Sequence, residues 1–444
     1  MKSEISAGDR VEVLLSKEKY EGTLLENPVL EKGIILLKLD SGYNIGLRKK
    51  GILEIKVVEK ASQVESSTTK LVQQKEKPNI AMIITGGTIA ARLNPKKGGV
   101  DWLTSPSDLF KFYPELFEKV NVVKVEVPFM KASEDMDFKD WQKVARVVVK
   151  LLNDSNIKGV IITHGTDFLH YTSAALSFFL RNLNKPVVLT YSQRSIDRAS
   201  SDANLNLQCS ALAAISDIAE VMLVGHASTN DDFCYAMPGT KVRKMHTSKR
   251  DAFKVINTKP FAKIFPDSTK NSENFGDSKT RSYGVIERIS EHRFRNKSKV
   301  VADAKFEEKV ALVKFYPGQD PGILEYYLKK KYKGIVLEMS GLGHVATKRA
   351  RKSWTKKLKE VQKKGLVVCA AGQTIYGRLN PLVYSNGREL LETGIIYLED
   401  MLAETALVKL GWVLGHANWT KDKEKIKEKM LENISGELND RLEK

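Results

Sequence analysis

Two threonine-containing segments follow short apolar runs and could supply hydroxyl nucleophiles. The segment TGGTIA (85–90) comes after the apolar run 80–84, and the segment THGTD (163–167) comes after the apolar run 160–162. Runs of this kind are typical of buried strands in a parallel sheet. Ligands bind outside the carboxyl ends of the strands in open α/β sheets. We therefore expect both segments to face one pocket.

The paired glycines Gly86 and Gly87 would allow a tight turn and a close approach of the backbone to a ligand. Two other interpretations stay open at this stage. A glycine-rich turn can cradle a phosphate, although the segment has neither the GxxxxGK[ST] loop nor the GxGxxG spacing. Thr88 could also serve only as the N-cap of a helix.

A threonine hydroxyl is a weak nucleophile unless a neighbouring base takes its proton. Asp167 is next to Thr166 and is a candidate orienting group, and Lys244 is a candidate base. Three further cations lie near this lysine in the sequence, namely Lys241, Arg243 and Lys249. Crowding by like charges would favour the neutral form that a base requires. Taken alone, one lysine among so many is better explained as a surface residue.

The cysteines and histidines give no support to metal or disulfide chemistry. The 3 cysteines and 7 histidines are scattered, without CxxC or HExxH spacing. No apolar run approaches the length of about 18 residues that a membrane span needs, and the first residues lack the apolar core of a signal peptide. We expect a cytoplasmic protein with no metal site.

The formal net charge of +18 has two explanations. It would attract a polyanion such as RNA. Abundant lysine and glutamate are also typical of the surface ion-pair networks of thermophilic proteins. The sequence has no RNP1 motif, KH loop or zinc finger that would decide between them.

The length of 444 residues indicates several domains, and the patterns of apolar residues predict an α/β fold with doubly wound parallel sheets after a small all-β module. Strand-like segments at 10–14, 34–39 and 52–57 suggest that the module is a small barrel. The predicted parts are a β-barrel (1–58), a linker (59–77), an α/β domain with the catalytic motifs (78–265), a polar connecting segment (266–309), a second α/β domain (310–420) and a charged helical tail (421–444).

Four apolar residues of the tail fall near one helical face, namely Ile426, Met430, Ile434 and Leu438. This face could bind a partner, or it could pack as a peripheral helix against its own subunit.

Three runs together resemble the bacterial-type L-asparaginase and glutaminase superfamily: TGGTIA at 85–90, THGTD at 163–167 and KMHTSKRDAF at 244–253. The resemblance implies an asparaginase-like fold of two α/β domains, with Thr88 as the acylated nucleophile. It also implies that Thr166, Asp167 and Lys244 form a second catalytic group in which Lys244 is the base.

The same resemblance implies a binding site for the amino-acid substrate. Asp167 and Ser133, the latter beside Glu134 in the run KASED (131–135), would hold its amino and carboxylate groups. Backbone N–H groups near the two threonines would stabilise the oxyanion.

The resemblance extends over nearly the whole chain. Segments 37–46, 340–345, 376–380 and 399–410 are similar to the D-type subunits of archaeal glutamyl-tRNA(Gln) amidotransferases. That family implies hydrolysis of glutamine, with transfer of the ammonia to a partner subunit that activates Glu-tRNA(Gln). It places no cofactor in this chain, implies ATP and Mg²⁺ in the partner, and suggests a homodimer within a heterotetramer.

One position departs from the superfamily pattern. Pro95 stands where a mobile loop usually has a tyrosine that helps to activate the nucleophile. Lys244 could then be the base for Thr88, another residue could close over the site, or activity could be low. A loop with Gly98 and Gly99 as its hinge would fit a lid.

Two rival functions remain at this stage. One is a free-standing L-asparaginase, which would not be expected to have the module at 1–58. The other is a non-catalytic RNA-binding or scaffold subunit, suggested by the net charge and by Pro95.

Overall fold

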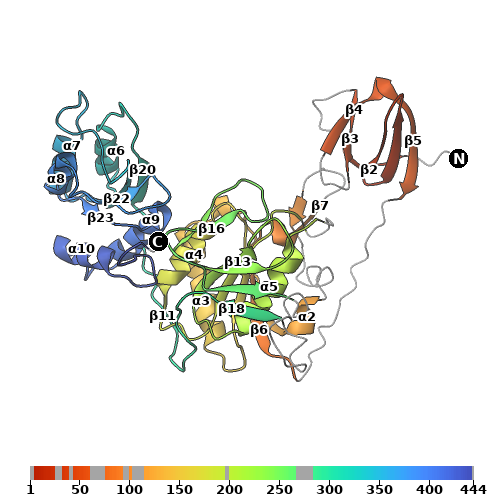
Figure 1. Ribbon diagram of the computed structural model, residues 1–444, viewed down its shortest axis with the longest axis horizontal. Coiled ribbons are helices and arrows are strands. Elements are labelled where there is room, and N and C mark those ends of the chain that lie inside the picture. The colour runs from red at the N-terminus through yellow and green to blue at the C-terminus, as the bar shows by residue number, and fades with distance from the viewer. Residues whose placement is uncertain are drawn as a thin grey trace.

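The structure is a computed structural model, and it describes residues 5–25, 33–39, 44–60, 76–93, 100–102, 115–195, 200–266 and 284–442. These residues form a small N-terminal sheet, a central α/β domain and a second α/β domain (Figure 1). The predicted loop around Pro95 (94–99) and most of the predicted linker (61–75) lie outside the described residues.

The N-terminal sheet is five-stranded and antiparallel, in the order β4-β3-β2-β1-β5. Its strands are β1 (Arg10–Leu15), β2 (Lys19–Leu25), β3 (Ile34–Lys38), β4 (Asn44–Arg48) and β5 (Ile52–Glu59). Val11, Val13, Leu37 and Leu47 form its core. The sequence predicted β1, β3 and β5 but missed β2 and β4. Within the described part of this sheet, no ladder joins β4 to β5, so it is an open sheet there.

The central domain is built on an eight-stranded sheet in the order β18-β17-β14-β13-β12-β10-β6-β9. Its strands are β6 (Asn79–Ile84), β9 (Asn121–Glu126), β10 (Val160–Thr163), β12 (Val187–Thr190), β13 (Val221–His226), β14 (Cys234–Pro238), β17 (Ala262–Phe265) and β18 (Val285–Arg288). The five neighbouring strands β9, β6, β10, β12 and β13 are parallel. The other three extend this parallel sheet with an antiparallel edge.

Helices cover both faces of this sheet because both sides of its parallel strands are apolar. Ala81 and Ile83 of β6 pack with α3 (Phe138–Leu152) and α4 (Leu169–Phe179). Ile80 and Met82 point to the other face and pack with α5 (Ala203–Ile215), beside the short α2 (Glu115–Lys119). The segments 85–90 and 163–167 therefore follow two strands, β6 and β10, that are covered by helices on both faces of the sheet.

Short strands outside the main sheet complete this domain. They are β7 (Ala91–Leu93), β8 (Val100–Trp102), β11 (Leu180–Arg181), β15 (Val242–Lys244), β16 (Phe253–Val255) and β19 (Val301–Ala302). The segment 266–309 was predicted to be only a polar connection, but it supplies β18 to the main sheet and β19, which pairs with β11. A backbone that pairs with a sheet edge needs no apolar run, so the sequence did not reveal these strands.

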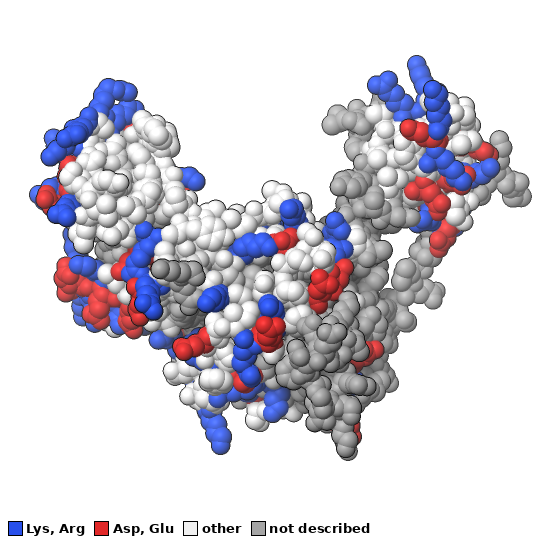
Figure 2. All heavy atoms as spheres, in the orientation of Figure 1, with Lys and Arg blue, Asp and Glu red and all other residues white. Residues whose placement is uncertain are grey.

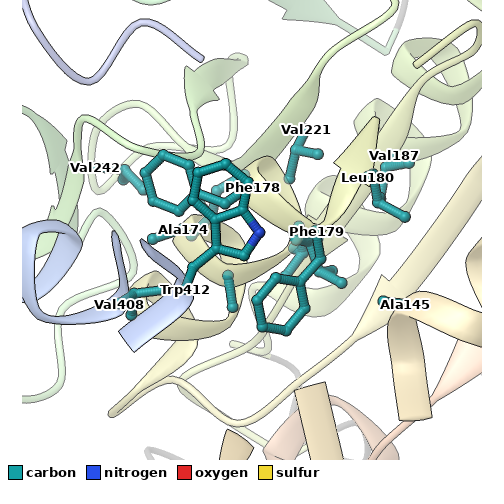
Figure 3. Close-up of a cluster of buried hydrophobic side chains, with 14 of the residues drawn as sticks. Ala145, Ala174, Phe178, Phe179, Leu180, Val187, Val221, Val242, Val408 and Trp412 are labelled. Carbon is teal, nitrogen blue, oxygen red and sulfur yellow. The ribbon is translucent and has the colours of Figure 1, made fainter. Parts of the chain in front are cut away.

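The second α/β domain has a four-stranded parallel sheet in chain order, with β20 (Val310–Lys314), β21 (Gly334–Met339), β22 (Val367–Gly372) and β23 (Ile396–Tyr397). Its helices are α6 (Ile323–Lys329), α7 (Thr355–Lys363), α8 (Ser385–Leu391) and α9 (Ala403–Leu414). Helix α9 packs against α4 of the central domain. Trp412 stacks on Phe178 with ring centroids 5.8 Å apart, within a cluster of buried side chains (Figure 3).

The C-terminal tail packs against its own subunit. Helix α10 (Lys423–Leu431) contacts α9, and Ile426, Met430 and Leu438 are buried in the same cluster as Trp412. Of the two interpretations of this apolar face, the structure supports the peripheral helix. The helix ends at Leu431, so the predicted helical tail is helical only in its first part.

Charged side chains of both signs are mixed over the central domain and around α10, whereas Lys and Arg gather at the outer ends of the N-terminal sheet and of the second α/β domain (Figure 2). Within the described part of the chain, no helix has the length and apolar character needed to cross a membrane.

Candidate active site

Three neighbouring strands of the central sheet bring their carboxyl ends into direct contact. A Cβ added to Gly87, just after β6, would lie 2.4 Å from the backbone nitrogen of Gly165, just after β10. A Cβ added to Gly86 would lie 2.3 Å from the carbonyl oxygen of Lys131, which follows β9. The two predicted segments, 85–90 and 163–167, therefore meet at one edge of the sheet.

Thr88 begins a short 3₁₀ helix, η2 (Thr88–Ala90), and Gly87 occupies its N-cap position. The interpretation of Thr88 as a capping residue is therefore wrong. Its side chain is half-buried, and its hydroxyl has no hydrogen-bond partner among the described residues. The hydroxyl is thus not committed to holding the fold together.

Lys244 contacts the second threonine directly. Its Nζ donates hydrogen bonds to Thr166 Oγ1 at 2.8 Å and to Asp167 Oδ1 at 2.6 Å. The lysine side chain is only 10% exposed, whereas that of Asp167 is 58% exposed. The carboxylate therefore holds the ammonium group from the open side of the site.

The predicted crowding of Lys244 by like charges is offset in the structure. Lys241 forms an ion pair of 2.6 Å with Asp400, and Arg243 forms one of 2.9 Å with Glu404. Lys241 and Arg243 thus each have their own carboxylate, as Lys244 has Asp167. Geometry, rather than like-charge repulsion, distinguishes Lys244 from the other lysines.

Ser133 and Glu134 lie beside the same strand end. Ser133 is buried, accepts a hydrogen bond from the Phe168 backbone N–H at 3.3 Å and donates one to Glu134 at 3.3 Å. A Cβ added to Gly165 would lie 3.1 Å from the Ser133 side chain. The structure thus brings together all six residues that the sequence singled out, from four separate segments.

His164 forms hydrogen bonds that hold the loop after β10 in place. Its Nδ1 donates to the Gly165 carbonyl at 2.7 Å, because a carbonyl can only accept, and its Nε2 accepts from the Thr172 hydroxyl at 2.9 Å. Burial lowers the pKa of His164 to about 4. The imidazole is therefore neutral at physiological pH, and its role is to orient the loop rather than to transfer protons.

Sequence reasoning missed Asp400 and Glu404. The segment 399–410 was noted only for its family resemblance, and no local signal ties a carboxylate to a lysine 159 positions away. Only the alternation of Arg243 and Lys244 along a strand indicates that these two side chains face different neighbours.

Within the described parts of the chain, no group of three or more His, Cys, Asp or Glu side chains is arranged to hold a metal ion. The chemistry available is that of a hydroxyl nucleophile beside a second hydroxyl, an amine and a carboxylate. Such a set fits attack on an acyl carbon, with the amine as the proton acceptor.

Three family models match the chain. Residues 5–58 match "GatD N-terminal domain", residues 79–275 match "Asparaginase, N-terminal", and residues 309–430 match "Glutaminase/Asparaginase C-terminal domain". These ranges correspond to the N-terminal sheet, the central domain and the second α/β domain.

Solved structures share the two α/β domains. The thermostable L-asparaginase from Thermococcus kodakarensis has a TM-score of 0.68 at 28% identity, covering 82% of this chain and 100% of that one. L-asparaginase I from Vibrio cholerae has a TM-score of 0.63 at 24% identity, covering 82% of this chain and 99% of that one. The second likeness shows the fold alone.

Full-length relatives share all three parts. The D-type subunit of glutamyl-tRNA(Gln) amidotransferase from Pyrococcus furiosus is 45% identical over 442 residues, which covers 98% of this chain and 95% of the relative. Its counterpart from Methanobrevibacter smithii is 39% identical over 440 residues, with 98% and 95% covered. Since the identity runs through the N-terminal sheet as well as the asparaginase-like part, the chain belongs to the GatD family, the D-type subunits of glutamyl-tRNA(Gln) amidotransferases.

Proposed function

We propose that this chain is the glutaminase subunit of a tRNA-dependent amidotransferase. It hydrolyses glutamine to glutamate and ammonia, and the ammonia serves the conversion of Glu-tRNA(Gln) to Gln-tRNA(Gln). The observation that carries the proposal is the contact of Lys244 with Thr166 and Asp167 at the strand end that touches Gly87, next to Thr88. Identity of 45% to a GatD protein over 98% of the chain supports the biological context.

Thr88 Oγ1 attacks the side-chain amide carbon of glutamine, and its proton passes through Thr166 to Lys244, which acts as the base. Backbone N–H groups of the two loops stabilise the oxyanion. The C–N bond then breaks, and the leaving nitrogen takes a proton and departs as ammonia. Water hydrolyses the ester on Thr88, which releases glutamate and restores the hydroxyl.

Asp167 and Ser133 recognise the amino-acid end of the substrate. The Asp167 carboxylate is open to solvent on one side and can accept hydrogen bonds from the substrate ammonium group. Ser133 and Glu134 complete this subsite from the segment after β9. Asparagine is one methylene shorter, so the distance between this subsite and Thr88 selects between the two amides.

The partner subunit binds Glu-tRNA(Gln) and activates it with ATP and Mg²⁺, while this chain works without a cofactor of its own. The proposed assembly is a homodimer of this chain within a heterotetramer, in the cytoplasm. The Lys and Arg groups at the outer ends of the molecule are the candidates for any direct contact with tRNA (Figure 2).

Ammonia release tests the proposal. The full-length chain is assayed with glutamine and with asparagine, each with and without the partner subunit and Glu-tRNA(Gln). We expect glutamine hydrolysis that rises on addition of both, and we expect Thr88→Ala to lower it about 10⁴-fold or more with an unchanged circular dichroism spectrum. Unchanged ammonia release by Thr88→Ala would rule the mechanism out.

A free-standing asparaginase is the second candidate, favoured by the likeness to the Thermococcus kodakarensis enzyme over 82% of the chain. It predicts asparagine as the better substrate and no response to tRNA or partner. Tight tRNA binding with no turnover of either amide would instead indicate a non-catalytic subunit.

A further inference from the structure

The strand that bears Lys244 belongs to no large sheet. β15 is three residues long and pairs only with β16, in a two-stranded ladder. Backbone pairing of this size is too small to fix a side chain within a fraction of an ångström. Other contacts must therefore set the position from which Lys244 reaches Thr166.

Two ion pairs hold this strand from the second α/β domain. Arg243 points to the side opposite Lys244, since side chains alternate along a strand, and Lys241 directly precedes β15. Lys241 Nζ donates to Asp400 Oδ2 at 2.6 Å and to the Asp400 carbonyl at 3.1 Å, with both side chains fully buried. Arg243 pairs with Glu404 at 2.9 Å, in the first turn of α9.

The tail completes the surroundings of the Asp400 carboxylate. The backbone N–H of Asn439 donates to Oδ1 at 3.1 Å, and its Nδ2 donates to Oδ2 at 2.7 Å and to the carbonyl of Asn257 at 2.7 Å. Asp400 thus accepts from a lysine of the central domain and from the chain terminus. A buried carboxylate with this many donors has one stable orientation.

We propose that Asp400, held by Asn439, is a positioning residue for Lys244, so that the second domain and the C-terminal tail set the placement of the catalytic base. The inference rests on the proposed function. Lys241 is bonded directly to Val242, the first residue of β15, and Lys244 is the last residue of that strand. A shift of Lys241 therefore moves the whole of β15, and with it the Lys244 amine.

Asn439→Ala tests the proposal because it removes both side-chain hydrogen bonds without changing the buried charges. Asn433→Ala is the matched control: this asparagine lies in the same tail, and among the described residues its side chain forms hydrogen bonds with the Leu438 carbonyl at 2.8 Å and the Gly436 N–H at 3.0 Å. Both are made in the full-length chain assembled with its partner subunit, and kcat, KM for glutamine and the thermal midpoint are measured.

We expect Asn439→Ala to lower kcat about 10-fold with KM within twofold of the parent, because a misplaced base weakens the transition state and not substrate binding. Asn433→Ala should lower the thermal midpoint comparably and leave kcat unchanged. Equal kcat in the parent and Asn439→Ala, or equal losses in both variants, would overturn the inference.

Asp400→Asn is a second test of the proposal, since it keeps the shape of the side chain and removes the charge that Lys241 faces. We expect a larger fall in kcat than in Asn439→Ala, again with little change in KM. Ammonia release by the parent chain distinguishes a failure of the proposed function from a failure of this inference. A parent that releases no ammonia overturns the proposed function and this inference together, whereas an active parent matched by Asn439→Ala overturns the inference alone.

Discussion

At the scale of single residues, two members of the proposed catalytic set make polar contacts with Lys244. Its amine touches Thr166 at 2.8 Å and Asp167 at 2.6 Å, while the Thr88 hydroxyl has no hydrogen-bond partner among the described residues. The two threonines are therefore not equivalent. Thr166 contacts the proposed base, whereas the hydroxyl of Thr88, the proposed nucleophile, makes no hydrogen bond within the described part of the chain.

Removing either member of the Lys244–Thr166 pair should disable the same step. We expect Lys244→Met and Thr166→Val each to lower kcat for glutamine by about 10²–10⁴, because general-base catalysis contributes this much. The double variant should be little worse than either single one, since groups that act as a unit are not additive. Kinetics of ammonia release in the three variants checks this, and additive losses would show that the two residues act in separate steps.

Local patterns predicted the residues of this set but not their support. Thr88, Thr166 and Asp167 could be found because they occur in short motifs after strand-like runs, and Lys244 because it occurs in a cation-rich segment that resembles a family motif. Asp400 could not be found in this way, because its contact with Lys241 depends on how two separate sheets are placed against each other. No periodicity within one segment carries that information.

At the scale of elements, the site depends on how closely three strand ends approach. Gly87 has φ +82° and would place a Cβ 2.4 Å from the Gly165 nitrogen. Gly87→Ala should therefore push the β6 and β10 loops apart and lower kcat at least about 100-fold, the cost of a misplacement near 1 Å. The measurement is ammonia release together with the thermal midpoint.

Gly318→Ala is the matched control for this variant. Gly318 also has φ +82°, but nothing lies within 4 Å of an added Cβ. It shares the backbone strain of the left-handed region without the collision. We expect a comparable strain cost to stability and full activity. Equal activity of the two variants would show that the approach of the two loops is not needed.

The loop after β10 also carries a pH-dependent part of the stability. Burial lowers the pKa of His164 to about 4, below its ordinary value of 6.5, so the unfolded chain binds the proton more readily. The contribution is fully present above pH 6.5 and is lost as the pH falls towards 4, in total about 3 kcal/mol. Urea unfolding of the parent and of His164→Gln between pH 4 and 7 should show a shallower fall in the variant. Parallel curves would contradict this role of His164.

Element types were predicted better than strand directions. The apolar periodicity at 141–148, 174–180 and 403–410 corresponds to α3, α4 and α9. The antiparallel edge formed by β14, β17 and β18 was not predicted, because direction depends on the connections between strands and not on the residues within them. This edge lies on the far side of β13 from the site, so the error did not affect the placement of the threonines.

At the scale of the whole molecule, two further interfaces, besides the ion pairs of Lys241 and Arg243, unite the central domain, the second domain and the tail. One is the apolar packing of α4 against α9 around Phe178 and Trp412 (Figure 3). The other is polar and lies at the tail, where the Ser435 carbonyl accepts from Thr240 at 2.9 Å and the Ser435 hydroxyl donates to Ser177 at 2.8 Å. The terminus therefore belongs to the central structure rather than to a detachable arm.

A buried ion pair between Lys409 and Glu437 holds this tail in place. Lys409 Nζ donates to Glu437 Oε1 at 2.6 Å, with both side chains fully buried, and Glu437 also accepts from the backbone N–H groups of Ile434 and Ser435. Lys409→Met leaves the carboxylate buried without its cation, so the free energy of unfolding should fall by about 3–5 kcal/mol. Lys425→Met, which removes an exposed pair with Glu428, should leave it nearly unchanged. Urea denaturation of both variants distinguishes these outcomes. Equal stability of the two would mean that the tail is held by its apolar contacts alone. The polar contacts from Asn439 through Asp400 to Lys241 would then not be what positions Lys244.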